Sequence, residues 1–212
     1  MSAAFRLVRL DCSQCGAPLA AEGDDVVYYC TACRSGFRLE GGEAGDAEER
    51  LERVEVAFVT LPGGTASRYL PFWLLPARVT LSERKASGGT FRGLARFFLG
   101  GEAETGSPPG EGTFAIPAFD APLAQVTALA QRYTQALPSL GERLGERLTG
   151  GCTSVEDAKK LAQFALIASE AEKPDTLQSL AYSIDWGPPR LLGVPFLDRG
   201  GRLADAHFGL AA

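Results

Sequence analysis

Short strand-forming runs separated by turn-forming residues open the chain. The run at 26–29 has strong strand propensity and leads directly into a cysteine, and residues 22–25 supply the turn before it. Residues 7–10 and 37–39 flank it as further short strands, which is typical of a small β module. Glycine and acidic residues then fill 41–53 with almost no apolar content, which predicts an exposed linker that tends toward helix at its end.

A second, larger part begins with strand patterns. Strand-like runs lie at 54–59, 69–81 and 113–117. The two prolines of the middle run predict an irregular or edge strand, because proline has no N–H to donate to a sheet ladder. Phe72 and Trp73 in the same run predict a core anchor, since aromatic side chains bury the largest area per residue.

Helical periodicity then replaces the strand pattern. Apolar residues recur at helical spacing in three segments: 123–138, 140–148 and 153–173. Pro174 ends the third, and residues 175–182 are expected to form one or two further turns. Two closing strands are expected at 190–196 and 203–210. Strands, then helices, then strands predict an α+β domain over 54–212, with a mainly antiparallel sheet and a helical layer on one face.

Four cysteines in the first part form two pairs with metal-ligand spacing. Cys12 and Cys15 are separated by two residues, and so are Cys30 and Cys33, with fourteen residues between the pairs. Two thiolates at this spacing can face one ion while the backbone turns around it. Gly16 follows the second thiolate, where an unusual backbone angle favours a residue without a Cβ.

This spacing and hairpin resemble the zinc ribbons of transcription factors and of many bacterial proteins, over residues 1–40 only. The resemblance implies one structural Zn²⁺, because four thiolates fill a tetrahedral site and leave no position for water or substrate. Cys33 is followed by Arg34 rather than glycine, which favours zinc over the iron of rubredoxins. A module this small has too little core to fold alone, so we expect metal removal to melt it.

Charge decides which partners the ribbon favours. The whole chain carries a net charge of -5 with a pI near 5.1. In the first forty residues four arginines face five acidic residues, and four thiolates on a divalent ion add about two further negative charges. Nucleic-acid binding depends on accumulated positive charge, so this balance argues against it. It favours a protein partner, or a ribbon that serves only as a folded cap.

One segment of the larger part is basic and aromatic. Residues 84–99 hold four positive charges interleaved with three phenylalanines and no acidic residue. Such a segment can dock on an anionic membrane surface or an acidic partner; the alternative is a hairpin whose apolar side folds back on the domain. The candidate contact residues are Arg84, Lys85, Phe91, Arg92, Arg96, Phe97 and Phe98.

Catalytic candidates are scarce, and we assign no catalytic residue and no small-molecule substrate. His207 is the single histidine, with Asp205 two residues before it, and no nucleophile elbow accompanies them. Cys152 is the fifth, unpaired cysteine and precedes a predicted helix start, where a thiol pKa can fall. An enzyme using Cys152 or His207 therefore remains an alternative; the competing interpretations are a packed cysteine and a surface histidine.

The sequence thus predicts three parts: a zinc ribbon at 1–40, an acidic linker at 41–53 and an α+β domain at 54–212. No apolar run approaches the roughly 18 residues of a membrane span, and the N-terminus lacks a signal-peptide pattern. We therefore expect a cytoplasmic, bacterial, non-catalytic interaction protein. The alternatives are a nucleic-acid-associated factor, an enzyme and a peripheral membrane binder.

Overall fold

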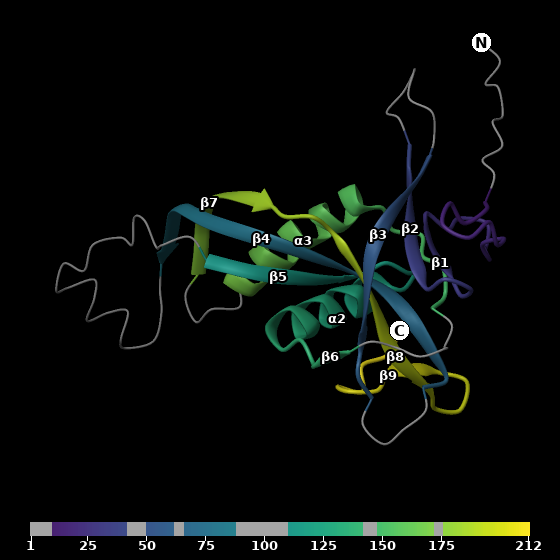
Figure 1. The fold of residues 1–212 in the computed structure, drawn as a ribbon. Helices are drawn as coiled ribbons and strands as arrows, with labels where there is room; N and C mark the ends of the chain where they lie inside the picture. Colours follow the sequence, from purple (N-terminus) through teal and green to yellow (C-terminus); the bar gives the residue numbers. More distant parts are fainter. Residues whose placement is uncertain (1–9, 42–49, 62–65, 88–109, 142–147, 172–175) are drawn as a thin grey trace, which may run out of the picture.

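The computed structural model describes residues 10–41, 50–61, 66–87, 110–141, 148–171 and 176–212 (Figure 1). We call residues 10–40 the ribbon and the described residues from 54 onward the body. The elements in chain order are β1 Val27–Cys30, β2 Ser35–Glu40, β3 Arg50–Val59, β4 Arg68–Ser87, β5 Gly110–Pro117, α2 Leu123–Gln135, β6 Leu140–Gly141, α3 Val155–Ala171, β7 Thr176–Trp186, β8 Arg190–Asp198 and β9 Leu203–Asp205.

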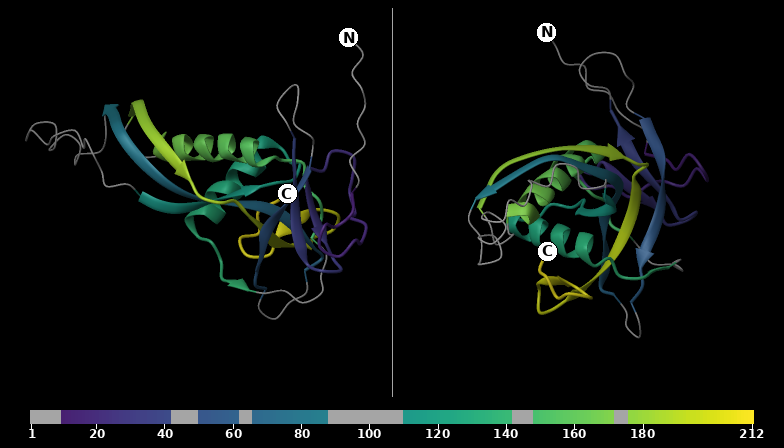
Figure 2. Two further views of the ribbon diagram at one scale, coloured as in Figure 1. Left: turned by 45° about the horizontal axis from the view of Figure 1, so that its top comes forward. Right: turned by 90° about the vertical axis from the view of Figure 1, so that its left-hand side faces the viewer.

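A large, mainly antiparallel sheet dominates the fold, as expected for the α+β class. Its strands run in the order β1-β2-β3-β8-β4-β5, with β6 on β3, β7 on β4 and β9 on β8. Only β3 and β8 pair in parallel among the described strands. The two views in Figure 2 show how strongly this sheet curves around the helices.

Strand β3 carries the ribbon into the body without a break. Its first half, from Arg50 to Val54, pairs with β2, and its second half, from Glu55 to Phe58, pairs with β8. Residues 50–53 therefore form a strand, although we expected them to be the helical end of the linker. They do so because they form backbone hydrogen bonds with β2. Residues 42–49 lie outside the described part, and the division into domains stays a prediction.

Strand β4 is central rather than an edge strand, which corrects the expectation drawn from its prolines. It pairs with β8 and then β7 on one side and with β5 on the other. Pro71 precedes the first residue that pairs with β5, and Pro76 falls between Leu74, where β8 pairing ends, and Ala77, where β7 pairing begins. Each proline thus stands where one neighbouring strand is absent, so no ladder hydrogen bond is lost there.

Alternate residues of β4 build the core on both faces of the sheet. Trp73 and Leu75 are almost fully buried in one cluster, together with Val155, Ala158 and Ala162 of α3. Phe72 and Leu74 point the other way, because successive strand side chains alternate between faces. They pack with Leu129 and Tyr133 of α2 in a second cluster.

The helices do not form the single layer that we expected. Helix α3 contributes to the first cluster, whereas α2 contributes to both. The N–H of Ala115 in β5 donates to the Thr134 hydroxyl of α2 at 3.0 Å. Helix α2 thus lies against β5, the last strand of the main sheet order, and reaches both cores from there.

One helical prediction is wrong, and another is contradicted at its ends, while its residues 142–147 lie outside the described part. Leu140 and Gly141 form β6, and Leu148 forms a bridge with Tyr69, so the repeat over 140–148 is not a helix at its described ends. Residues 176–186 form β7 along β4 instead of further helical turns. The pairing surface offered by the long β4 overrides the local pattern there.

Candidate metal centre

The four cysteine sulfur atoms lie together, as the spacing predicts. All four Sγ atoms are within 4.8 Å of one another. Cys12 Sγ lies 3.4 Å from Cys33 Sγ, and Cys15 Sγ lies 3.6 Å from Cys30 Sγ. A tetrahedral zinc with Zn–S bonds of about 2.3 Å places its sulfurs about 3.8 Å apart, whereas a disulfide needs about 2.05 Å. The donor set therefore fits one tetrahedral metal ion and no disulfide.

The two knuckles share one backbone conformation. The N–H of Gly16 donates to the carbonyl of Cys12 at 2.8 Å, and the N–H of Arg34 donates to the carbonyl of Cys30 at 2.7 Å. Both donors have positive φ, 72° at Gly16 and 61° at Arg34. The predicted role of Gly16 is confirmed, and Arg34 occupies the equivalent position of the second knuckle although it carries a Cβ.

We expect Arg34→Gly to stabilise the metal-loaded protein by about 0.5–1 kcal/mol. A residue with a Cβ destabilises the folded state by about 1–2 kcal/mol in this left-handed conformation. Glycine removes this strain, but its greater conformational freedom in the unfolded chain offsets part of the gain. Urea unfolding followed by circular dichroism measures the change. Arg34→Ala is the matched control: it removes the same exposed side chain and keeps the strain, so an equal gain from alanine would contradict the explanation.

Hydrogen bonds around the sulfurs move the pKa values of two of the thiols in opposite directions. Against the lowering effect of the Ala17 backbone, burial and the hydrogen bonds with Cys12, Cys30 and Cys33 raise the pKa of Cys15 to about 12. The hydrogen bond from the Ser35 side chain lowers the pKa of the Cys33 thiol to about 6. The backbone N–H of Gln14 points at Cys12 Sγ from 3.4 Å. Cys12 and Cys30 are both 2% exposed and pack with the fully buried Phe37. The cluster is thus shielded from water on its inner side, and a bound cation would favour the thiolate form of all four cysteines.

Strand β1 has one face on the cysteine cluster and the other on the body core. Tyr28 and Cys30 belong to the cluster around the sulfurs. Val27 and Tyr29, which alternate with them, belong to the large core cluster of the body. The ring of Tyr29 meets that of Phe58 edge to face, with centroids 5.8 Å apart. The ribbon is therefore built into the body and is not a loosely tethered module.

A strap formed by residues 148–153 ties the two parts together. The carbonyl of Gly151 accepts the N–H groups of Val26 at 2.7 Å and Val27 at 3.0 Å. At the other end of the strap, the indole N–H of Trp73 donates to the carbonyl of Thr153 at 2.8 Å. A Cβ on Gly151 would come within 2.4 Å of the Ala118 carbonyl oxygen, so only glycine fits at this position of the strap.

The catalytic alternatives find little support in the geometry. Burial and then the nearby Asp120 carboxylate raise the pKa of Cys152, which works against a reactive thiolate. His207 places Nε2 2.9 Å from the carbonyl oxygen of Thr60. Asp205 Oδ1 accepts the backbone N–H of His207, and both carboxylate oxygens are engaged by other donors. A catalytic Asp205–His207 pair would need the carboxylate to contact the imidazole ring, whereas here it contacts the backbone N–H of His207.

The basic-aromatic segment is only partly described. Arg84 and Lys85 lie in β4, opposite Leu180 and Ser179 of β7. Lys85 forms an ion pair with Glu83 at 2.5 Å. The other candidates, Phe91, Arg92, Arg96, Phe97 and Phe98, fall outside the described residues. Membrane or partner contact by this segment stays a prediction.

Sequence reasoning missed the buried carboxylate of Asp205, which is 0% exposed. It accepts the Tyr133 hydroxyl at 2.9 Å and three backbone N–H groups from the turn that follows it. The signal was an aspartate four residues before Gly209, since Asp often caps a turn that ends in glycine; φ at Gly209 is 72°. The partner Tyr133 could not be inferred, because it comes from α2.

No family model, curated protein or solved structure matches the chain. Within the described residues, neither helix is long and apolar enough to cross a membrane.

Proposed function

We propose that this protein is a non-catalytic interaction protein in which a structural zinc ion builds part of a docking surface for another protein. The observation that carries the proposal is the closed set of four thiolates beside strand β1, which contributes Cys30 to the cluster and whose reverse face lies in the body core. Four protein ligands leave a tetrahedral zinc no open position for chemistry. The ion therefore has a structural role and takes no part in a chemical reaction.

The surroundings of the site support this choice over the alternatives. A metal-bound cluster of four thiolates and an acidic chain offer no footprint for phosphates. The two candidate catalytic groups, Cys152 and His207, lie in environments that explain them without chemistry: raised pKa in one case, a carbonyl contact in the other. Acting inside an intracellular bacterial assembly is part of the same proposal.

Affinity purification of the tagged protein from its source organism tests the proposal. After mild cross-linking, we expect mass spectrometry to find a reproducible protein partner that is lost from a Cys15→Ser, Cys33→Ser variant. Cys152→Ser is the matched control, because it removes a cysteine outside the cluster and should keep the partner. Recovery of nuclease-sensitive nucleic acid in place of a protein would support the rival function.

A further inference from the structure

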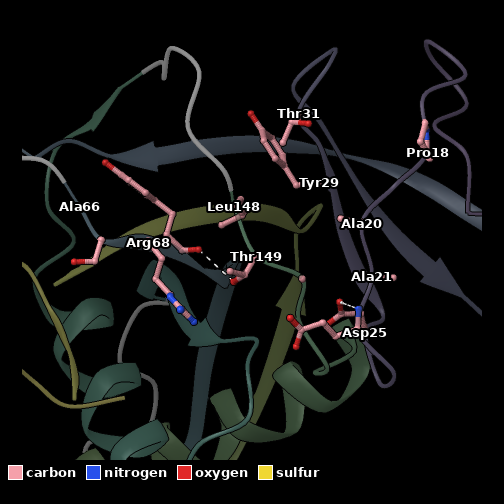
Figure 3. A pocket seen from close by; sticks show the side chains of 14 residues that line it. Pro18, Ala20, Ala21, Asp25, Tyr29, Thr31, Ala66, Arg68, Leu148 and Thr149 are labelled. Carbon is pink, nitrogen blue, oxygen red and sulfur yellow. Dashed lines mark hydrogen bonds between the residues drawn. The ribbon is translucent and has the colours of Figure 1, made fainter. Parts of the chain in front are cut away.

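A continuous groove runs along the seam between the ribbon and the body. A cavity of about 750 Å³ lies between ribbon residues such as Ala21 and the start of β4. A second cavity, of about 530 Å³, leads on toward Asp120 and Cys152. The two cavities share five lining residues and so form one groove: Glu22, Asp25, Arg68, Thr149 and Gly150. Figure 3 shows Asp25 on the ribbon side of the first cavity and Arg68 on the body side.

The walls of the groove are negatively charged. Glu22, Asp24, Asp25 and Asp120 bring four carboxylates, against the single guanidinium of Arg68. Within the described part of the chain, no ion pair neutralises these carboxylates. The groove therefore carries a formal charge of about -3, which repels phosphates and attracts cationic groups.

The ribbon wall of the groove is held in a fixed position. The Asp25 side chain accepts the N–H of Glu22 at 2.7 Å and lies directly against the strap. A Cβ on Gly150 would come within 2.0 Å of Asp25 Oδ2, so the carboxylate packs onto the strap backbone. Because the cysteine cluster folds this part of the ribbon, one wall of the groove depends on the metal. A groove preformed in this way loses little entropy when it binds.

We propose that the groove binds an extended segment of the partner protein that carries lysine or arginine, and that it does so only in the metal-loaded state. Each cavity falls within the volume range of ordinary ligand sites, and two joined cavities offer more room than one small cation needs. Hydroxyl groups of Thr31, Ser67 and Thr149 line the first cavity beside the carboxylates, which suits a peptide backbone. The inference rests on the proposed function and names the chemistry of the partner.

Fluorescence anisotropy on the zinc-loaded protein tests the proposal, with a labelled peptide of alternating lysine and glycine as the probe. We expect binding of this probe and none of its glutamate counterpart. The double variant Asp24→Asn, Asp120→Asn should weaken binding about tenfold, since two partly screened attractions are lost. The double variant Glu111→Gln, Asp185→Asn is the matched control, because it removes the same amount of charge from β5 and β7, outside the groove.

Two further variants separate the groove from general attraction. Arg68→Gln should strengthen lysine-peptide binding several-fold, because it removes a repulsive charge from the groove. Ala21→Trp should weaken it without changing any charge, by filling the first cavity. Equal weakening by the double variant and the control, or weakening by Arg68→Gln, would overturn the proposal. Full displacement of the labelled peptide by spermine, added at the same concentration of positive charge, would also overturn it, because that result would indicate a polyamine site.

The metal dependence has its own readout. Protein treated with a chelator should lose the anisotropy signal, and retained binding would contradict the proposed role of the ribbon wall. The two proposals can also fail separately. A captured partner that binds the groove variants as well as the wild type would remove the groove and leave the interaction function. Peptide binding without any captured partner would remove that function instead.

Discussion

Loss of the metal should destabilise the body as well as the ribbon. Chelation, or Cys30→Ser at a buried ligand, removes the ion that holds the four thiolates together, and metal binding is folding free energy in a module of this size. Val27 and Tyr29 then leave the body core, where they are 0% and 7% exposed. Their burial contributes about 1.5–3 kcal/mol each, so we expect the body to lose about 3–6 kcal/mol.

Metal analysis and hydrogen exchange measure this effect together. The wild type should hold one metal ion per chain, and Cys30→Ser should hold none. On chelation, the amides of Val26 and Val27, which donate to the Gly151 carbonyl, should lose protection along with the strap amide of Gly151 itself. Cys152→Ser should keep both metal and protection. Unchanged exchange in the strap after metal removal would show that ribbon and body fold independently, and visible iron–thiolate absorption would argue against zinc.

Replacement of Asp205 should have the second large effect. Asp205→Ala leaves the Tyr133 hydroxyl and three backbone N–H groups without their acceptor in a fully buried place. Unsatisfied buried donors cost about 1–3 kcal/mol each, and partial relaxation of the turn should bring the total to about 3–5 kcal/mol. The same turn joins β9 to the end of the chain, where Ala204 bridges Ala211. The second core should therefore loosen with it.

Urea unfolding of a small variant series tests this assignment. Tyr133→Phe should cost less, about 1–2 kcal/mol, because the carboxylate keeps its three backbone donors. The double variant with Asp205→Asn should show coupling between the two side chains. Asp185→Asn on the exposed face of β7 is the control and should change stability by no more than about 0.5 kcal/mol. A similarly small loss for Asp205→Ala would contradict a structural role for this carboxylate.

Local chemistry made the metal centre readable from sequence. Two cysteines two residues apart can face one ion whatever surrounds them, so the spacing alone brought Cys12 near Cys15 and Cys30 near Cys33. Gly16 was readable for the same reason. Helix α3 was also readable, because Val155, Ala158 and Ala162 recur at helical spacing. Its N-cap is Ser154, whose hydroxyl accepts the N–H of Asp157 at 3.1 Å, one residue later than a capping box over 153–156 would place it.

Features that depend on distant neighbours were misread. The prolines of β4 suggested an edge strand, yet each falls where one partner strand is absent, and nothing near Pro71 or Pro76 in sequence reveals that. The segment that became β7 alternates from Leu180 onward, but Pro174 before it suggested a broken helix. Its partner is β4, about a hundred residues away.

The sequence by itself determined that four thiolates meet, that the protein mixes strands with helices, and that its charge is negative. These follow from short-range spacing, periodicity and composition. Only the tertiary structure decided that the ribbon shares its strand β1 with the body core, that Asp205 is buried beneath Tyr133, and that the acidic groove lies along the seam. These features join residues far apart in the chain, and no local pattern records which distant surfaces will meet to bury them.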